Sequence, residues 1–178
     1  MNNRKYKQFQ EEVMPSLKNK FEYTNDLQVP RLKKIVISRG INSEEARSTN
    51  VLDELVQDIA LISGQKPIIR KAKKSIASFK IRDGMPNGIM VTLRKERMYS
   101  FFDRFVSIAS PRIRDFQGFK IKSDKKGNIT IGVKDQRIFV EAENRSNKGF
   151  QFTIVTSAQT EAEGKALIEE LGFPVSKN

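Results

Sequence analysis

Between Gly64 and Arg94 the chain reads GQKPIIRKAKKSIASFKIRDGMPNGIMVTLR. Ile68 and Ile69 begin a strand that leads into a run of basic residues. From Gly88 onward, GIMVTLR alternates apolar and polar residues, which is typical of a half-buried strand. We therefore expect the two strands to pair as a hairpin whose long basic loop covers about residues 70–88.

This hairpin carries a charge that is hard to bury. Up to Gly88 it contains one acid, Asp83, and the following cations: Lys66, Arg70, Lys71, Lys73, Lys74, Lys80 and Arg82. Each Lys or Arg that neutralises a phosphate releases a condensed counterion, so this stretch favours a polyphosphate partner. The composition of the whole chain supports the same kind of partner, because 33 Lys and Arg against 21 Asp and Glu give a net charge of +12. A positive field of this size steers anionic polymers to the surface.

A solvated, mobile loop is the simpler interpretation of such a charge run. Ile76, Phe79 and Ile81 interrupt the charges, however, and indicate a loop that docks on something. The ring of Phe79, beside Lys80, could stack on a base or ribose, or it could anchor the loop to the sheet. The sequence leaves both roles open.

Composition limits the classes of function. A chain of 178 residues with 38% hydrophobic content is long enough for one domain with a core. No apolar run could span a membrane, and the N-terminus is too polar for a secretory signal, so we expect a soluble, intracellular protein. Cys and His are absent, which excludes disulfides and thiolate metal sites and removes the commonest general base. We expect neither a cofactor nor a metal, and not an enzyme.

The first part of the chain predicts a helix and a strand. A helix over about residues 4–22 follows from apolar residues at every fourth position, namely Phe9, Val13, Leu17 and Phe21. Pro15 either kinks or breaks this helix. LKKIVIS, from Leu32 to Ser38, is a strand with Ile35 and Ile37 on its dry side. Its wet side carries Lys34, Val36 and Ser38.

Three helices and two strands complete the pattern. One helix has an apolar stripe of Val51, Leu52, Leu55, Val56, Ile59 and Ile62. A second contains Met98, Phe101, Phe102, Phe105, Val106 and Ile108. It must stop at Pro111, because proline lacks an amide proton and clashes with the preceding turn. Residues 129–133 and 150–156 alternate as strands, and a last helix begins at Thr160, with Glu163 completing a capping box.

The order helix, strand, helix, strand, strand, helix, strand, strand, helix contains a βαββαβ core. It predicts an α+β fold, with an antiparallel-rich sheet, helices on one face and the long basic hairpin loop. We expect residues 1–178 to form a single domain. The other face of the sheet stays free and presents Lys34, Ser38, Thr92 and Arg94, which can donate to phosphate oxygens and 2'-hydroxyls. A flat polar face suits RNA better than a small molecule.

Several segments, taken in order, resemble one family. They are ISGQKPIIRKAKKSIASFKIRDGMPNGIMVTLRKERMYSFFDRF, SPRIRDFQGF, GNITIGVKDQRIF and IVTSAQTEAEGKALIEELGFP. From about Tyr6 to Pro174 the chain looks like bacterial-type large ribosomal subunit protein five, the family that binds 5S ribosomal RNA. The resemblance implies an α+β fold in the central protuberance of the large subunit. It also implies contacts with 5S rRNA, 23S rRNA, peptidyl-site tRNA and neighbouring large-subunit proteins.

The resemblance transfers contact residues position by position. The family's 5S rRNA surface falls on Lys34, Ser38, Arg39, Gln65, Lys66, Thr92, Arg94 and Arg97. The loop that approaches peptidyl-site tRNA falls on Lys71, Lys73, Lys74, Ser75, Phe79 and Lys80. PRIRDF also matches the family, so Arg112 and Arg114 are expected to contact RNA or the small subunit.

The chain departs from the family pattern at three places, one of which is an unusually lysine-rich loop between Lys122 and Gly127. Ser38 stands where the family's first strand usually has Asn, so the RNA contact there is expected to be weaker or rearranged. After Phe139, the loop of residues 140–149 is shorter than in the family and lacks its proline and its acidic, tyrosine-containing segment. In the family that loop helps bridge to a small-subunit head protein, which is a further candidate partner here.

These observations together predict a structural, non-enzymatic RNA-binding protein of a cytoplasmic ribosome, with an organellar ribosome left open. The alternative is a free RNA chaperone or nucleoid-type nucleic-acid-binding protein, which would share the charge without selecting 5S rRNA. A hydrolase that uses paired carboxylates, such as Glu44 with Glu45, is a third class. Charges of that kind usually form a solvated helix face.

Overall fold

The structure is a computed structural model that describes residues 3–145 and 147–176. Its α-helices are α1 (Arg4–Gln8), α2 (Met14–Lys20), α3 (Thr49–Ser63), α4 (Lys95–Arg104) and α5 (Glu161–Glu170). Its strands are β1 (Leu32–Gly40), β2 (Ile68–Lys71), β3 (Pro86–Leu93), β4 (Lys122–Ser123), β5 (Ile129–Val133) and β6 (Phe150–Thr156). Two π-helical turns, η1 (Phe9–Val13) and η5 (Phe105–Ala109), follow α1 and α4. The predicted order is confirmed, with the short β4 as an addition.

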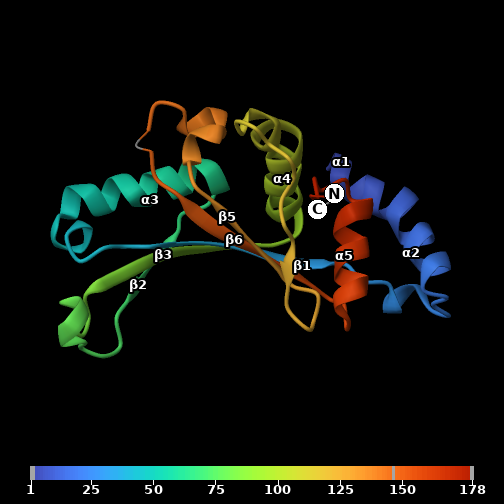
Figure 1. Cartoon of the computed structure of the whole chain (residues 1–178), viewed down its shortest axis with the longest axis horizontal. Helices are drawn as coiled ribbons and strands as arrows, with labels where there is room; N and C mark the ends of the chain where they lie inside the picture. The colour runs from blue at the N-terminus through green and yellow to red at the C-terminus, as the bar shows by residue number, and fades with distance from the viewer. Residues whose placement is uncertain (1–2, 146, 177–178) are drawn as a thin grey trace. The chain divides into compact units, whose positions relative to one another are not determined.

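The strands follow the order β2-β3-β1-β6-β5-β4, and with the helices they form the predicted α+β fold (Figure 1). The predicted hairpin is present, since β2 and β3 pair antiparallel with Ile68 opposite Met90 and Ile69 opposite Ile89. The ladder shifts register between Arg70 and Lys71, where the basic loop begins.

The chain divides into two compact units. The aromatic unit comprises Met1–Ile35, Arg94–Ile131 and Phe152–Asn178. The hairpin unit comprises Val36–Leu93 and Gly132–Gln151. The division falls within β1, β5 and β6, so each unit contains part of these strands.

In the hairpin unit, one side of the strands is dry. Ile89, Val91 and Leu93 on β3 are almost fully buried, whereas the residues between them are half-buried. The helix α3 lies over this side (Figure 1) and contributes four buried apolar residues: Leu52, Leu55, Ile59 and Ile62. On the opposite side of β2 and β3, Figure 1 shows no described α-helix. The alternation expected from the sequence is therefore confirmed for this unit.

Each proline within a helical segment follows a π-helical turn. η1 ends two residues before Pro15, and η5 ends two residues before Pro111. In both turns an amide bonds to the carbonyl five residues earlier, Met14 to Phe9 and Ser110 to Phe105. A widened turn accommodates the proline ring, which would clash with the carbonyl of a regular turn. The N-terminal helical segment therefore continues through Pro15, and the segment at Pro111 ends with a 3₁₀ turn, Ser110–Arg112.

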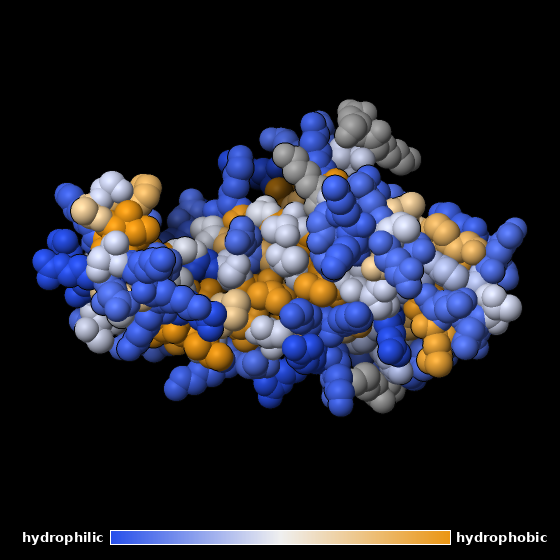
Figure 2. All heavy atoms as spheres, turned by 90° about the horizontal axis from the view of Figure 1, so that it is seen from below, coloured by the Kyte–Doolittle hydropathy of each residue, from blue (hydrophilic) through white to orange (hydrophobic). Residues whose placement is uncertain are grey.

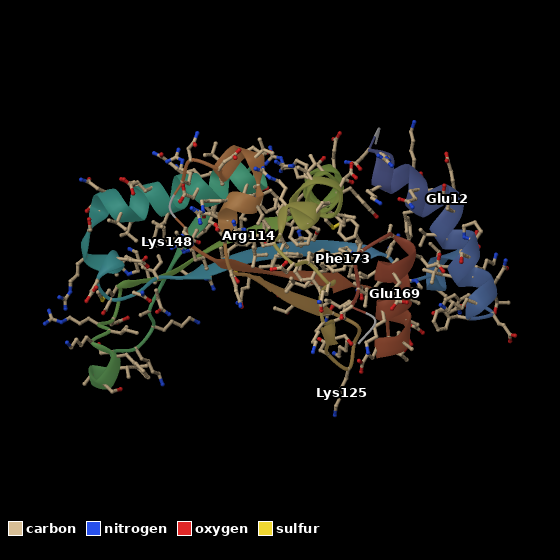
Figure 3. All side chains as sticks on the ribbon, turned by 45° about the horizontal axis from the view of Figure 1, so that its top comes forward. Glu12, Arg114, Lys125, Lys148, Glu169 and Phe173 are labelled. Carbon is tan, nitrogen blue, oxygen red and sulfur yellow. The ribbon has the colours of Figure 1, made fainter. Side chains whose placement is uncertain are left out.

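The core of the aromatic unit is a cluster of phenylalanines around Phe105. The Phe105 ring is fully buried and meets Phe152 edge to face, with 4.6 Å between ring centroids. It also stacks on Phe173, labelled in Figure 3, at 5.9 Å, and lies 5.5 Å from Phe119. These rings come from β6, from the segment after α5 and from the segment before β4. Phe105 therefore joins η5 to β6 and to the two segments that follow α5 and precede β4.

Lys5 ties the N-terminal helical segment to the end of α5. Its side chain is buried, and Nζ donates to the Leu171 carbonyl and to Gln8 Oε1, both at 2.9 Å. Burial lowers the pKa of Lys5, with the nearby charge of Asp103 opposing the shift. A cation at the carbonyl end of a helix also complements the helix dipole.

The core of the hairpin unit contains a buried cation, Arg39. Its side chain is 6% exposed, and Nη2 lies 3.6 Å from Glu45 Oε1. Lys148, labelled in Figure 3, also bonds to Glu45, and the Asn42 amide donates to Glu45 Oε2 at 3.1 Å. Burial alone would raise the pKa of Glu45, but the hydrogen bonds from Lys148 and Asn42 and the two cationic charges hold it below its usual value.

Phe105→Ala should lower the free energy of unfolding by about 4 kcal/mol, because it removes a fully buried ring and leaves a cavity. Ile108→Ala changes the same π-helical turn at a position that is 46% exposed, and should cost less than about 1 kcal/mol. Urea unfolding followed by circular dichroism measures both. Equal costs would show that the aromatic cluster does not support this unit.

Glu45→Gln should lower the free energy of unfolding at pH 7 by about 2 kcal/mol, because the buried Arg39 loses its counter-charge. The pKa of Glu45 is lower in the folded chain than its ordinary value of 4.5. The stabilisation is therefore present above that value and lost as the pH falls through the folded pKa. In urea unfolding, the difference from wild type should therefore be the same at pH 7 and 5 and should shrink at pH 4 and further at about pH 3.

Glu54→Gln, at an exposed position on α3, is the matched control and should change the free energy of unfolding little at any of these pH values. A pH-independent difference between wild type and Glu45→Gln would contradict the assignment of the effect to the ionised carboxylate.

Candidate nucleic-acid interface

Strand alternation leaves a polar face on the hairpin unit. Ser38 on β1 and Thr92 on β3 are half-buried and lie on the side away from the buried Ile37 and Val91. Gln151 on β6 is exposed and donates from Nε2 to Ser38 Oγ at 3.2 Å. Hydroxyl and amide groups of this kind hydrogen-bond to ribose and phosphate.

Gln65 and Lys66 lie beside this face, directly after α3. The helix ends at Gly64, whose φ of 67° is a left-handed conformation that glycine adopts without strain. Gln65 Nε2 donates to the Thr92 carbonyl at 3.4 Å, and Ser63 Oγ donates to the Gln65 carbonyl at 2.9 Å. These bonds hold the turn next to β3, while the Lys66 side chain is exposed.

Arg39 differs from the rest of the predicted 5S rRNA set. It follows Ile35 and Ile37 on the dry side of β1 and is buried against Glu45. Burial lowers the pKa of Arg39, which the charges of Glu45 and Asp58 partly oppose. Within the described residues its Nη1 is buried without a hydrogen-bond partner. In this structure Arg39 supports the hairpin unit, and it would have to leave Glu45 to contact RNA.

The aromatic unit holds the predicted cations that lie outside the hairpin unit. Lys34 is half-buried on the wet side of β1. Arg94 and Arg97 are exposed at the start of α4, where Arg94 is the N-cap residue. Arg112 and Arg114 are exposed in the segment after η5, and Figure 3 labels Arg114. Five of the predicted contact cations are therefore accessible or partly accessible in this unit.

The basic loop folds into a second, smaller hairpin. Ile76 and Ile81 exchange backbone hydrogen bonds of 2.9 and 3.2 Å in an antiparallel bridge. The 3₁₀ turn η4 (Ala77–Phe79) lies between them, and Lys80 closes it with a left-handed φ of 53°. The Asp83 amide donates to Ser75 Oγ at 2.9 Å. We call residues 71–83 the basic tip.

The basic tip directs its side chains to solvent. The residues predicted to approach tRNA are all exposed: Lys71, Lys73, Lys74, Ser75, Phe79 and Lys80. Figure 2 shows hydrophilic and hydrophobic side chains next to each other at this end of the hairpin unit. The Phe79 ring is 68% exposed, which favours the stacking role over the anchoring role that the sequence left open.

Polar residues of β5 and β6 were missing from the predicted site. In the aromatic unit, Thr130 Oγ1 and Thr153 Oγ1 lie 2.9 Å apart and share a hydrogen bond. In the hairpin unit, Gln151 belongs to the polar face described above. The sequence could have placed these residues on the polar side, because they alternate with Ile131 and Phe152, the buried residues that predicted the two strands.

The shortened loop of residues 140–149 is fastened to the hairpin unit. Arg145 Nε lies 3.5 Å from Oδ1 of Asp58, a buried residue of α3, and Lys148 bonds to Glu45. Residue 146 lies outside the described residues. Val140 is 55% exposed. The two ion pairs hold the described part of this loop close to α3 and to the segment after β1.

Within residues 3–145 and 147–176, no cluster of acidic side chains has the arrangement of a metal site. In the same residues, no helix is both long and apolar enough to cross a lipid bilayer. The arrangement instead offers hydrogen-bonding groups on a strand face and cations on a projecting tip. Such groups bind a ribose-phosphate backbone without breaking a bond.

Two family models match the chain. The model described as ribosomal protein L5 matches residues 25–82, and the model described as the C-terminus of the same ribosomal protein family matches residues 86–175. The hairpin strands and the basic tip fall where the first match ends and the second begins.

Curated relatives of similar length agree with these matches. Large ribosomal subunit protein uL5 of Nostoc punctiforme is 52% identical over 170 residues, which cover 93% of each chain. The uL5 protein of Geotalea daltonii is 49% identical over 93% of this chain and 94% of its own. That of Lactobacillus delbrueckii subsp. bulgaricus is 47% identical over 95% of this chain and 96% of its own. The chain therefore belongs to the bacterial-type L5 family of large-subunit ribosomal proteins and is a structural constituent of the ribosome.

Proposed function

We propose that this protein binds 5S rRNA in the central protuberance of the large subunit and approaches peptidyl-site tRNA with its basic tip. The observation that carries the proposal is the combination, in the hairpin unit, of a polar strand face with a folded cationic tip. Family membership supports a ribosomal setting for both surfaces. In this proposal residues 1–178 act as a single RNA-binding domain of a cytoplasmic ribosome.

The 5S rRNA contact uses hydroxyl, amide and cationic groups. Ser38, Thr92 and Gln65 would hydrogen-bond to riboses and phosphates, because they lie on or beside the polar face. The cations of this contact would be Lys34, Lys66, Arg94 and Arg97. Such a surface recognises the shape and backbone of RNA more than its base sequence. Arg39 takes part only after release from Glu45.

The tRNA contact uses the basic tip. Its lysines are exposed, and none of Lys71, Lys73, Lys74 and Lys80 has an ion-pair partner within the described residues. Their charge is therefore available to phosphates, and contacts with phosphates do not depend on which tRNA is bound. The exposed Phe79 ring adds a surface on which a base or ribose can stack.

Other contacts follow from the same family. Arg112 and Arg114 would contact 23S rRNA or the small subunit, and neighbouring large-subunit proteins would cover part of the remaining surface. A bridge to a small-subunit head protein would use the exposed end of the 140–149 loop, at Val140. The protein binds and positions RNA, and we propose no catalysed reaction for it. Family membership favours this function over a free RNA chaperone.

The affinity for 5S rRNA should fall steeply with salt. If about 5 phosphates are contacted, log K plotted against log[salt] should have a slope of about −4. Fluorescence anisotropy between ~50 and ~300 mM KCl measures the slope, and a scrambled RNA of the same length should bind at least about tenfold more weakly. A flat slope would remove the electrostatic basis of the proposal, and equal affinities for the two RNAs would favour the chaperone.

Replacing Lys73, Lys74 and Lys80 with Ala should reduce retention of peptidyl-site tRNA on assembled ribosomes by about tenfold, because the tip loses cations that face phosphates. The affinity of the free protein for 5S rRNA should change by less than about twofold. Filter binding of labelled tRNA and anisotropy with 5S rRNA measure the two effects.

The matched control removes the same charge from exposed lysines outside the tip: Lys20, Lys125 and Lys126. Lys125 is labelled in Figure 3, where its side chain points away from the ribbon. This control should retain tRNA. Equal losses in both assays for the tip variant would show that the two RNA surfaces are wrongly assigned.

A further inference from the structure

The hairpin unit has a hollow between the turn of the basic tip and the segment that follows β1. Its lining comes from two segments, the one that follows β1 and the end of the tip itself, and consists of Ile41, Asn42, Ser43, Glu44, Phe79 and Ile81. None of these residues except Phe79 belongs to the contact sets described above. The hollow is therefore a feature that the proposed function does not yet use.

Both walls of the hollow are held in place by backbone hydrogen bonds. The Ile41 amide donates to the Asn87 carbonyl at 3.1 Å, and the Arg47 amide donates to the Glu44 carbonyl at 3.2 Å. On the other wall, Ile81 is bonded in both directions to Ile76. A ligand would meet a preformed site, which reduces the entropic cost of binding.

The hollow has an apolar base and a polar rim. Ile41 is 7% exposed and Ile81 is half-buried, while the Phe79 ring is 68% exposed and forms an open aromatic wall. Asn42 and Glu44 are exposed on the rim. Among the described residues, the side-chain amide of Asn42 and the Glu44 carboxylate have no hydrogen-bond or ion-pair partner, since the bond from Asn42 to Glu45 uses the backbone N–H. Both groups are therefore available to a ligand.

The carboxylate of Glu44 determines which ligand fits. This carboxylate lies next to a tip whose cations attract phosphate. Its negative charge would repel RNA unless the RNA donates hydrogen bonds to the carboxylate. Guanine alone among the four RNA bases presents two adjacent donors, N1–H and N2–H, on its Watson–Crick edge. Two parallel donors match the two oxygens of one carboxylate.

We propose that this hollow binds a single unstacked guanine of an RNA strand that contacts the basic tip. The base stacks on the Phe79 ring, its Watson–Crick edge donates to the Glu44 carboxylate, and the Asn42 side chain contacts the remaining polar edge. Lys80 and its neighbours hold the flanking phosphates. The inference rests on the proposed function in one respect, namely that the tip approaches RNA. The guanine site would let the tip select one base, whereas its phosphate contacts do not depend on the RNA sequence.

The test compares short RNA strands that differ at one base. Full-length protein is titrated, at one salt concentration, into labelled oligouridylates that carry a central guanine, adenine or hypoxanthine. The guanine strand should bind about tenfold more tightly than the adenine strand, the order expected for one bidentate contact. The hypoxanthine strand, which lacks the N2 amino group, should lie between them.

Three variants at exposed positions separate the roles of the lining residues. Glu44→Gln should abolish the guanine preference and leave the affinity for the adenine strand unchanged or slightly higher. Phe79→Ala should weaken all three strands. Lys80→Ala is the matched control: it should weaken all strands while the preference for guanine persists. Melting curves that match the wild type verify that each variant is folded.

Equal affinities for the three strands, or a guanine preference that survives Glu44→Gln, would overturn the inference. The affinity for 5S rRNA, measured on the same samples, should be unchanged by Glu44→Gln. If the wild type prefers guanine but does not select 5S rRNA, the proposed function fails and the guanine site stands. If it selects 5S rRNA without preferring guanine, the inference alone is rejected.

Discussion

Burial of one side of every long strand is the constraint that sets both the fold and the polar face of the hairpin unit. Ile35 and Ile37 on β1 and Val91 on β3 are almost inaccessible to solvent, and each fully buried side chain of this size contributes about 2 kcal/mol. A register slip of one residue would expose them all, so the register is strongly specified. Because side chains alternate along a strand, Ser38 and Thr92 then lie on the side of β1 and β3 that faces away from the core. The polar face is thus a direct consequence of the core.

Local signals explain why most of the fold was predictable. Period-two alternation located β1, β3, β5 and β6, and the capping box of Thr160 and Glu163 marked the start of α5, as the structure confirms. The free strand face was predictable for the same reason, since it contains the positions that alternate with the core. Prediction worked wherever a property followed directly from strand alternation or from a capping motif.

Features that depend on one specific pairing of residues were not predictable from alternation or capping. Arg39 alternates with Ile35 and Ile37 on the dry side of β1, but no sequence pattern indicated its ion pair with Glu45, and the family transfer placed it among the RNA contacts. The π-helical turn before Pro15 keeps the helical segment going, although the ring alone suggested a kink or a break. The bridge between Ile76 and Ile81 folds the basic loop into a hairpin, whereas the sequence indicated only that the apolar residues of this loop dock on something. Each case requires a partner that no local pattern identifies.

The hairpin unit uses its cations in two different ways. Arg39 and Lys148 share Glu45, and Arg145 faces Asp58, so these charges hold the loop of residues 140–149 against the core. The lysines of the basic tip have no such partners within the described residues. The two acids near the core, Glu45 and Asp58, thus pair with cations of the core and of the 140–149 loop and not with those of the tip. Because the tip is folded by backbone bonds rather than by ion pairs, its positive charge remains available while its shape is kept.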